Sequence, residues 1–260
     1  MKLFLRNLIY IFLGKLSVVF HLKKPKIIIF AYHSLGDDDW LYEISYRNFC
    51  TQINEVKKTR KYIKLEEIYK YLIGETELDG DYFCVCFDDG YKNIFDFADK
   101  IKNELKITPA VFLISNKSKI NRFELENNKE LLDEDEIKYL INLGWEIGNH
   151  TSTHPNLKNL NFFDKEIEII NSKQLLEEKL GIKIKYIAYP KGCYDKDVIG
   201  ISRKTGYLLG LTMDDGIIDK SCDLLKIPRI GVDKSHGINI FKYIFLPLNI
   251  YFRALVKHIS

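Results

Sequence analysis

Short apolar runs alternate with longer amphipathic segments along the middle of the chain. The runs are typical of strands buried on both faces, because they are short and continuous and do not alternate between polar and apolar residues. Strands that alternate with helices predict an α/β fold with a parallel sheet, and about seven such pairs favour a (β/α) barrel over an open sheet. The runs expected as strands are residues 26–32, 82–87, 110–114, 145–149, 186–189, 207–212 and 225–230.

The segments between these runs carry helix signals. One of them opens with acidic residues and is followed by Gly144, and another is followed by Gly181. Acidic side chains stabilise the start of a helix, and glycine commonly ends one. The segments expected as helices are residues 46–59, 92–105, 133–143 and 163–180.

The first 20 residues form an apolar, basic segment. Thirteen of the 18 residues from 3 to 20 are apolar, but Lys15 interrupts the run and makes a membrane-spanning helix unfavourable. No small-residue cleavage site of a secretory signal peptide is recognised after the run. A helix here would have two contrasting sides, which is typical of a helix in a membrane interface, although packing on the domain is the alternative. Its apolar stripe is Leu5, Ile9, Phe12, Leu16 and Phe20, and its other side is Lys2, Arg6, Tyr10, Gly14, Ser17 and His21.

Charge is unevenly distributed. The 39 basic and 36 acidic residues give a net charge of +3, but residues 1–26 and 234–260 together hold ten basic residues and no acidic one. The middle is therefore acidic, with 29 basic and 36 acidic residues, which does not resemble a nucleic-acid-binding face. Residues 241–259 repeat the apolar, basic character of the first segment. We predict contact with an anionic membrane surface through residues 1–22 and 241–259.

The five cysteines are scattered, and no C-x-x-C pair occurs. This predicts neither a disulfide framework nor a cysteine zinc site, and it favours a reducing compartment. A chain of 260 residues with 46% hydrophobic residues is long enough for one α/β domain. We expect that domain over residues 26–233, flanked by segments 1–25 and 234–260, in a membrane-associated protein at the cytoplasmic face.

Two carboxylates follow one predicted strand directly. Asp88 and Asp89 come after the run that ends at Phe87 and before Gly90. Parallel α/β folds place their sites at the carboxyl ends of strands, and adjacent buried carboxylates repel each other unless a cation or a proton is present. A bound cation is one interpretation, and an ordinary Asp-Gly turn is the other.

Two histidines follow another predicted strand. His150 and His154 are four residues apart, so on one face of a helical turn both imidazoles could reach a single metal ion, although two surface histidines are the alternative. With Asp89 they would form a set of two nitrogens and one oxygen. Three protein ligands leave positions open for water, as in catalytic metal sites.

A third polar loop follows the predicted strand at residues 186–189. Pro190 and Gly192 would fix a tight loop around Lys191 and expose a backbone N–H, although an ordinary turn after the strand would look the same.

Together these elements resemble the polysaccharide deacetylase family, also called the NodB homology domain or carbohydrate esterase family 4. The resemblance covers about residues 26–233, and Phe-Asp-Asp-Gly, His-Thr-x-x-His and Tyr-Pro-x-Gly come in the family's order. The elements Ala31-Tyr32-His33 and Ile227-Pro228-Arg229-Ile230 are similar to the subgroup that deacetylates poly-N-acetylglucosamine and related bacterial sugars.

The resemblance implies a distorted (β/α) barrel with about seven strands and removal of an acetyl group from an N-acetylated saccharide. It implies that Asp88 is the general base and that Asp89, His150 and His154 hold a divalent metal, of which a bound water is the nucleophile. Zinc suits this ligand set, and cobalt, nickel and manganese are alternatives. The resemblance further implies that the backbone N–H of Lys191 stabilises the oxyanion.

Two assignments stay open within the resemblance. The family's late Leu-x-His element is absent, so the acid that protonates the leaving amine is expected to be His33, with His236 as the alternate. Many members have an arginine just before the proline loop, where this chain has Ala188, so Arg229 is expected to orient the base. The side chain of Lys191 would suit an acidic or phosphate-bearing substrate, although a solvated lysine is the alternative. The functional alternatives are a hydrolase of a non-sugar linear or cyclic amide and a non-catalytic carbohydrate-binding relative.

Overall fold

The fold is built on a curled sheet of parallel strands. The computed structural model describes residues 2–23, 25–120, 125 and 129–257. The sheet has the order β10-β1-β5-β6-β7-β8-β9, and β4 (Lys61–Tyr62) pairs with the first part of β5. The strands in that order are β10 (Ile230–Gly231), β1 (Ile27–Tyr32), β5 (Tyr82–Phe87), β6 (Ala110–Leu113), β7 (Glu146–Asn149), β8 (Tyr186–Ala188) and β9 (Leu209–Leu211).

The segment that contains β10 links the last strand of the sheet, β9, to the first, β1. Ile227 N–H donates to the Gly210 carbonyl in β9, at 2.8 Å, and Val232 N–H donates to the Ala31 carbonyl in β1, at 2.9 Å. One segment thus hydrogen-bonds to both ends of the strand order. The predicted distorted barrel of about seven parallel strands is confirmed. Six of its strands lie within predicted apolar runs, whereas β10 begins only at Ile230, the last residue of the run predicted at 225–230.

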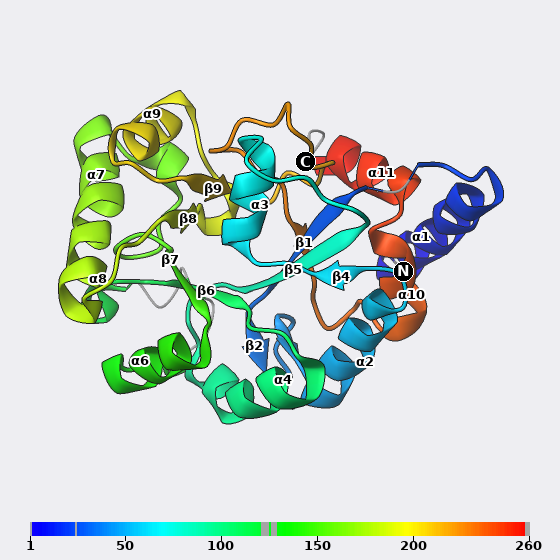
Figure 1. Cartoon of the computed structure of the whole chain (residues 1–260), viewed down its shortest axis with the longest axis horizontal. Helices are drawn as coiled ribbons and strands as arrows, with labels where there is room; N and C mark the ends of the chain where they lie inside the picture. The colour runs from blue at the N-terminus through cyan, green and yellow to red at the C-terminus, as the bar shows by residue number, and fades with distance from the viewer. Residues whose placement is uncertain (1, 24, 121–124, 126–128, 258–260) are drawn as a thin grey trace.

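Helices surround the curled sheet (Figure 1). The four expected helical segments are all present, although residues 92–105 begin with a 3-10 helix and residues 162–180 contain a π-helical turn, η4 (Ile167–Asn171). Several further elements were not predicted, namely α3, α9, β4 and a small pair of strands, β2 (Ser34–Leu35) and β3 (Glu43–Ile44). The helices of the barrel are α2 (Tyr46–Lys57), α3 (Leu65–Leu72), α4 (Ala98–Leu105), α6 (Glu134–Leu143), α7 (Phe162–Glu166), α8 (Ser172–Leu180) and α9 (Lys196–Lys204).

Burial on both faces explains why the strands do not alternate in polarity. In β5, Val85 and Phe87 belong to the apolar layer beneath the surrounding helices, whereas Cys84 and Cys86 belong to a second cluster on the other face. Four residues of α3 join that second cluster, namely Leu65, Ile68, Tyr71 and Leu72. Both faces of the sheet are therefore buried against apolar side chains. All five cysteines are free thiols.

The two ends of the chain lie side by side. Helix α1 (Lys2–Val19) packs on α10 (Ile238–Ile244) and α11 (Pro247–Lys257) at one side of the barrel, on the right in Figure 1. Among the described residues, no helix combines the length and apolar character needed to cross a membrane. Residues 1, 24 and 258–260 of the two predicted terminal segments lie outside the described residues, and the boundaries at 25/26 and 233/234 stay predictions.

Candidate active site

The two aspartates lie at the carboxyl end of β5, at the bottom of a cavity of about 370 Å³. Both are buried, and Asp88 continues the strand by donating its N–H to the Tyr32 carbonyl at 2.9 Å. The predicted site residues His33, Asp88, Asp89, His150, His154 and Lys191 line this central cavity, together with Trp40, Tyr42, Leu125 and Met213.

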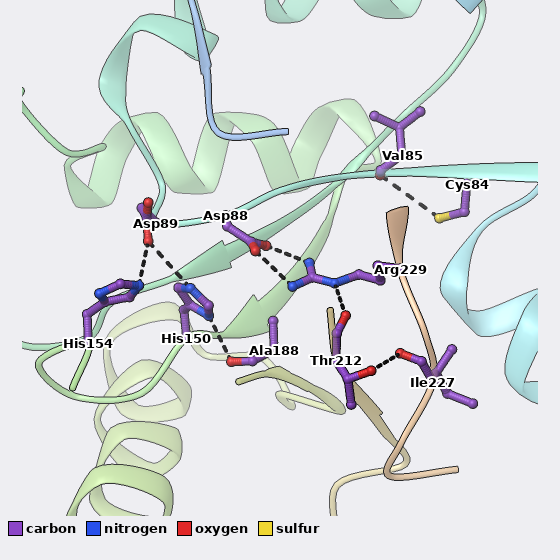
Figure 2. Close-up of polar contacts among 10 residues, drawn as sticks. All are labelled: Cys84, Val85, Asp88, Asp89, His150, His154, Ala188, Thr212, Ile227 and Arg229. Carbon is purple, nitrogen blue, oxygen red and sulfur yellow. Dashed lines mark hydrogen bonds and ion pairs between the residues drawn. The ribbon is translucent and has the colours of Figure 1, made fainter. Parts of the chain in front are cut away.

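Asp89 and the two histidines converge on one point (Figure 2). The Asp89 Oδ1 atom lies 3.4 Å from His150 Nε2 and 3.3 Å from His154 Nε2, and all three residues are buried. Ligands about 2.0–2.1 Å from an ion, at tetrahedral angles to one another, are about 3.3 Å apart. The spacing from Asp89 to each histidine and the two-nitrogen, one-oxygen donor set fit a divalent transition-metal ion, and all three ligand atoms lie within 4.8 Å of one another.

The protonation states of these ligands also suit a cation. His150 places its Nδ1 atom 2.8 Å from the Ala188 carbonyl, which can only accept, so the proton lies on Nδ1 and the Nε2 lone pair faces Asp89. Burial lowers the pKa of His150 to about 4, which keeps the imidazole neutral at physiological pH. Burial raises the pKa of Asp89, so the ionised carboxylate needs a positive partner in this position.

The histidines lie on a loop, so the predicted helical turn between them is wrong. Thr151 and His154 have φ values of 67° and 64°, in the left-handed region that a right-handed helical turn excludes. The Thr151 Oγ1 atom accepts a hydrogen bond from the His154 N–H at 3.2 Å. The loop brings both imidazoles to Asp89 by turning the backbone rather than by helical periodicity.

A buried glutamate holds this loop and was missed by the sequence reasoning. Glu168 lies in η4 and accepts hydrogen bonds from the N–H groups of Ser152 and Thr153, at 2.8 and 2.9 Å, and from the Thr153 hydroxyl, at 2.7 Å. A π-helical turn of this kind is often found at functional sites. The sequence of η4 has no pattern that marks a π-helical turn, so the contact of Glu168 with the histidine loop is visible only in the folded structure.

We expect the change Glu168→Gln to weaken metal binding by about tenfold, because residues that orient metal ligands typically contribute this much. The amide removes the negative charge that accepts from the two N–H groups, and it replaces the oxygen that accepts from the Thr153 hydroxyl with a donor. Metal titration of the variant measures the effect, and Glu178→Gln, an exposed change on α8, is the matched control. Equal affinity in the two variants would show that the loop needs no such anchor.

Backbone strain gathers around the central cavity. Asp89 and Lys191 also have positive φ values, of 67° and 58°, so with His154 three of its lining residues are left-handed without being glycine. Such conformations cost of order 1–3 kcal/mol each and persist where the surrounding contacts fix them. The strained backbone conformations therefore occur where the metal-ligand candidates and the Lys191 loop meet at the central cavity.

Asp88 forms a buried ion pair with Arg229 (Figure 2). The guanidinium donates from Nη1 to Oδ1 at 2.7 Å and from Nη2 to Oδ2 at 2.8 Å, and its Nε donates to the Thr212 carbonyl at 3.2 Å. Burial alone would raise the pKa of Asp88, but the charge and hydrogen bonds of Arg229 hold it well below its usual range. The structure thus brings the predicted base and the predicted orienting arginine together.

The two candidate proton donors lie in different surroundings. His33 follows β1, borders the central cavity and places its ring 4.8 Å from that of Tyr42. His236 is absent from the lining of that cavity, as far as the described residues show, and its ring stacks on Tyr10 of α1 at 6.3 Å. Its Nδ1 atom accepts a hydrogen bond from the Asp233 N–H at 3.1 Å. The structure therefore brings His33, and not His236, to the cavity.

An aromatic wall of the cavity was also missed. Trp40 and Tyr42 lie between β2 and β3, with their rings 5.5 Å apart, and Trp40 packs on Tyr91 at 5.2 Å. The sequence signal was two aromatic residues after three aspartates in a predicted loop. Such a signal is too common to indicate a site without the fold.

The fold and site define a parallel α/β barrel with three residues that could hold a metal ion, and comparison with known proteins identifies its family. The family model for polysaccharide deacetylase matches residues 76–222, more than half of the chain. The chain belongs to the polysaccharide deacetylase family and is a hydrolase acting on N-acetyl amide bonds.

Individual relatives agree. The chain is 26% identical, over 201 residues, to the poly-β-1,6-N-acetyl-D-glucosamine N-deacetylase of Staphylococcus epidermidis, covering 74% of this chain and 68% of that protein. It is 25% identical to the protein YxkH of Bacillus subtilis over 148 residues, which are 57% of this chain but only half of the length of YxkH.

Solved structures share the fold. The Streptococcus pyogenes deacetylase PplD, in complex with acetate, has a TM-score of 0.72 and 22% identity, over 85% of this chain and 99% of that one. IcaB from Ammonifex degensii has a TM-score of 0.74 and 20% identity, over 85% and 97%.

Proposed function

We propose that this chain removes the acetyl group from an N-acetylated saccharide of the cell envelope, either a polysaccharide or a lipid-linked sugar. The observation that carries the proposal is the convergence of Asp89, His150 and His154 with the arginine-held Asp88 in one buried cavity. The saccharide class is supported by the Staphylococcus epidermidis relative, whose name specifies N-acetyl-D-glucosamine.

The metal would be held by Asp89, His150 and His154, with zinc as the preferred ion and cobalt, nickel or manganese as alternatives. A divalent cation bound there would act as a Lewis acid on the amide carbonyl and make a water molecule more acidic. The neutral imidazole of His150 and the fixed position of its proton prepare the site for that cation before it binds.

Asp88 then acts as the general base. Its carboxylate stays ionised beside Arg229 and can accept a proton from the attacking water. The two parallel hydrogen bonds from Arg229 also fix the plane of the carboxylate, so the base does not have to be oriented during the reaction. The backbone N–H of Lys191, at the cavity rim, donates to the carbonyl oxygen as it becomes negative.

His33 supplies the second proton. It borders the same cavity and would donate to the nitrogen of the scissile amide as the carbon–nitrogen bond breaks, so that acetate and a free amine leave. The proton taken up by Asp88 returns to solvent. Packing of its ring against Tyr42 holds the imidazole of His33 at the edge of the cavity.

Acetate release from a panel of N-acetylated saccharides, measured beside metal analysis of the same preparation, tests the proposal. We expect acetate from at least one N-acetylglucosamine oligomer or lipid-linked sugar. Cleavage of small linear or cyclic amides alone would instead indicate a non-sugar amidase. Saccharide binding with no acetate from any substrate would indicate a non-catalytic relative.

We expect chelation of the metal to lower acetate release at least about a hundredfold, because the cation supplies several kcal/mol of stabilisation to the developing charge. Added zinc, cobalt, nickel or manganese should restore activity, whereas magnesium, which prefers oxygen ligands, should not. Acetate release before chelation, after chelation and after each addition is the measurement. Full activity in metal-free protein would contradict the proposed role of the triad.

A further inference from the structure

Helix α1 buries the middle of its more polar stripe, and it exposes Leu5 and Phe12 of its apolar stripe, with Ile9 and Leu16 half-buried. Tyr10 and Ser17, from the side expected to be more polar, are 5% and 3% exposed. Phe4, Phe12 and Phe20, on or just beyond the helix, are 69%, 62% and 66% exposed. A helix that merely packs on a soluble domain has the opposite orientation, with its apolar stripe against the core.

Specific contacts fix this orientation. The backbone carbonyl of Tyr10 accepts a hydrogen bond from Asn249 at 2.8 Å, and the Ser17 hydroxyl accepts one from the Leu248 N–H at 3.2 Å. At Gly14, an added Cβ atom would lie 2.4 Å from the Tyr243 ring, so only glycine allows α1 to approach α10 this closely. The helix therefore cannot rotate to bury its apolar side without losing these contacts.

Helix α11 extends the exposed apolar surface. Tyr251 and Leu255 are 60% and 61% exposed, and Val256 lines the same groove as Leu5 of α1. Monomeric soluble proteins rarely expose large continuous apolar patches, so this surface is expected to be covered by something. We call it the apolar face, defined by Phe4, Leu5, Leu8, Phe12, Val18, Val19, Phe20, Tyr251, Leu255 and Val256.

The charge around the apolar face indicates what covers it. Residues 1–26 and 234–260, which contain its helices, have only basic charged residues, and Lys15 and Lys242 are exposed there. The remainder of the chain has seven more acidic than basic residues, from 36 and 29. An anionic surface would therefore attract this face and repel the rest of the molecule, which would set the orientation of binding.

A groove lies between the apolar face and the central cavity. It has a volume of about 500 Å³, with Leu5 and Val256 on its apolar part and Arg6 and Arg253 within it. Three further lining residues, His33, Tyr42 and Met213, also line the central cavity. The two spaces are therefore adjacent, and the proposed proton donor His33 borders both of them.

We propose that the apolar face docks on a lipid bilayer that carries anionic headgroups, and that the groove then gives the central cavity access to saccharides anchored at that membrane surface. Docking needs no catalytic activity, whereas the choice of membrane-anchored saccharides as substrates rests on the proposed deacetylase function. Apolar side chains would enter the boundary between headgroups and acyl chains, as in other interfacial helices.

Flotation of the full chain with phosphatidylcholine vesicles, with and without phosphatidylglycerol, tests the docking. We expect binding to the anionic vesicles, weakened by salt, and a loss of at least about tenfold in the variant Phe12→Glu, because an exposed phenyl ring that would enter the lipid is replaced by a charge. Phe163→Glu, on α7, is the matched control, since Phe163 is 67% exposed away from this face. Neither change touches the central cavity, so metal content should stay constant.

Binding of wild type and Phe12→Glu to anionic vesicles with equal affinity would overturn the proposal. So would a dimer, seen by light scattering, that Phe12→Glu dissociates, because a second copy would then cover the face. For the substrate class, we expect faster acetate release from a vesicle-anchored saccharide than from its soluble form. If the protein binds the vesicles but releases acetate equally fast from the anchored and the soluble saccharide, the proposed access through the groove is wrong. If neither saccharide releases acetate, the deacetylase function is wrong instead.

Discussion

The variant Asp88→Asn is expected to release acetate at least about 10³-fold more slowly than the wild type while it retains its metal. General base catalysis contributes roughly 10²–10⁴-fold, and an amide cannot accept the proton of the attacking water. The metal should remain because Asp88 is held by Arg229, whereas the ligand oxygen belongs to Asp89. Acetate release and metal content, both measured on one preparation, check the result.

The neighbouring change Asp89→Asn separates the two carboxylates. It should lower metal content as well as activity, because it removes the charged ligand that faces both histidines at 3.3–3.4 Å. Added zinc at high concentration should partly restore Asp89→Asn but leave Asp88→Asn inactive. If Asp88→Asn kept more than about a tenth of the wild-type rate, another group would have to be the base.

The sequence was most informative where burial left a simple pattern. A strand that is buried on both faces has a continuous apolar run, so residues such as Val85 and Cys86 indicated β5 without any knowledge of the fold. Helix α6 was equally clear, because Asp133 accepts a hydrogen bond from the Glu136 N–H at its start, and Gly144 ends it with a φ of 93°. The apolar run of β5 and the capping residues of α6 are both local in sequence, and interactions between near neighbours were enough to predict these two elements.

The missed elements depend on contacts between distant segments. Helix α3 is only eight residues long, and its apolar side is explained by the far face of the sheet, which the sequence does not display. The contacts of Glu168 with Thr153 span 15 residues, and the pairing of Arg229 with Asp88 spans 141. Arg229 was predicted only because the family resemblance left an empty place for it.

The orientation of α1 shows the limit of pattern reasoning in another way. Its two stripes were visible in the sequence, but not which of them faces the barrel. The answer depends on Gly14 against Tyr243 and on Asn249 against the backbone of Tyr10, which are contacts between the two ends of the chain. The spacing of apolar residues in the sequence predicts the two faces of a helix, whereas the elements that pack against the helix determine which face is buried.

Replacement of Arg229 by Gln is expected to lower the free energy of unfolding of the metal-free protein by about 3–5 kcal/mol at neutral pH. Removal of one partner from a buried ion pair leaves the other charge uncompensated, and here both oxygens of Asp88 lose a hydrogen bond. Urea denaturation measures the loss. The control Arg203→Gln breaks the pair of Arg203 with Asp223, in which the arginine is 62% exposed, and should cost no more than about 1 kcal/mol.

The pH dependence of the Arg229→Gln effect distinguishes loss of charge compensation from simple loss of packing. In the wild type, the lowered pKa of Asp88 contributes stability above the unfolded value of about 3.9, and this contribution is lost as the pH falls below it. Without Arg229, burial dominates and raises the pKa of Asp88 above its unfolded value, so its ionisation destabilises the variant as the pH rises. The difference in stability between the two proteins should therefore shrink towards pH 4, and the acidic limb of kcat/KM should move to higher pH in the variant. A difference that stays constant from pH 4 to 7, with an unmoved acidic limb, would show that Arg229 acts by packing on Phe112 and not by holding the charge of the base.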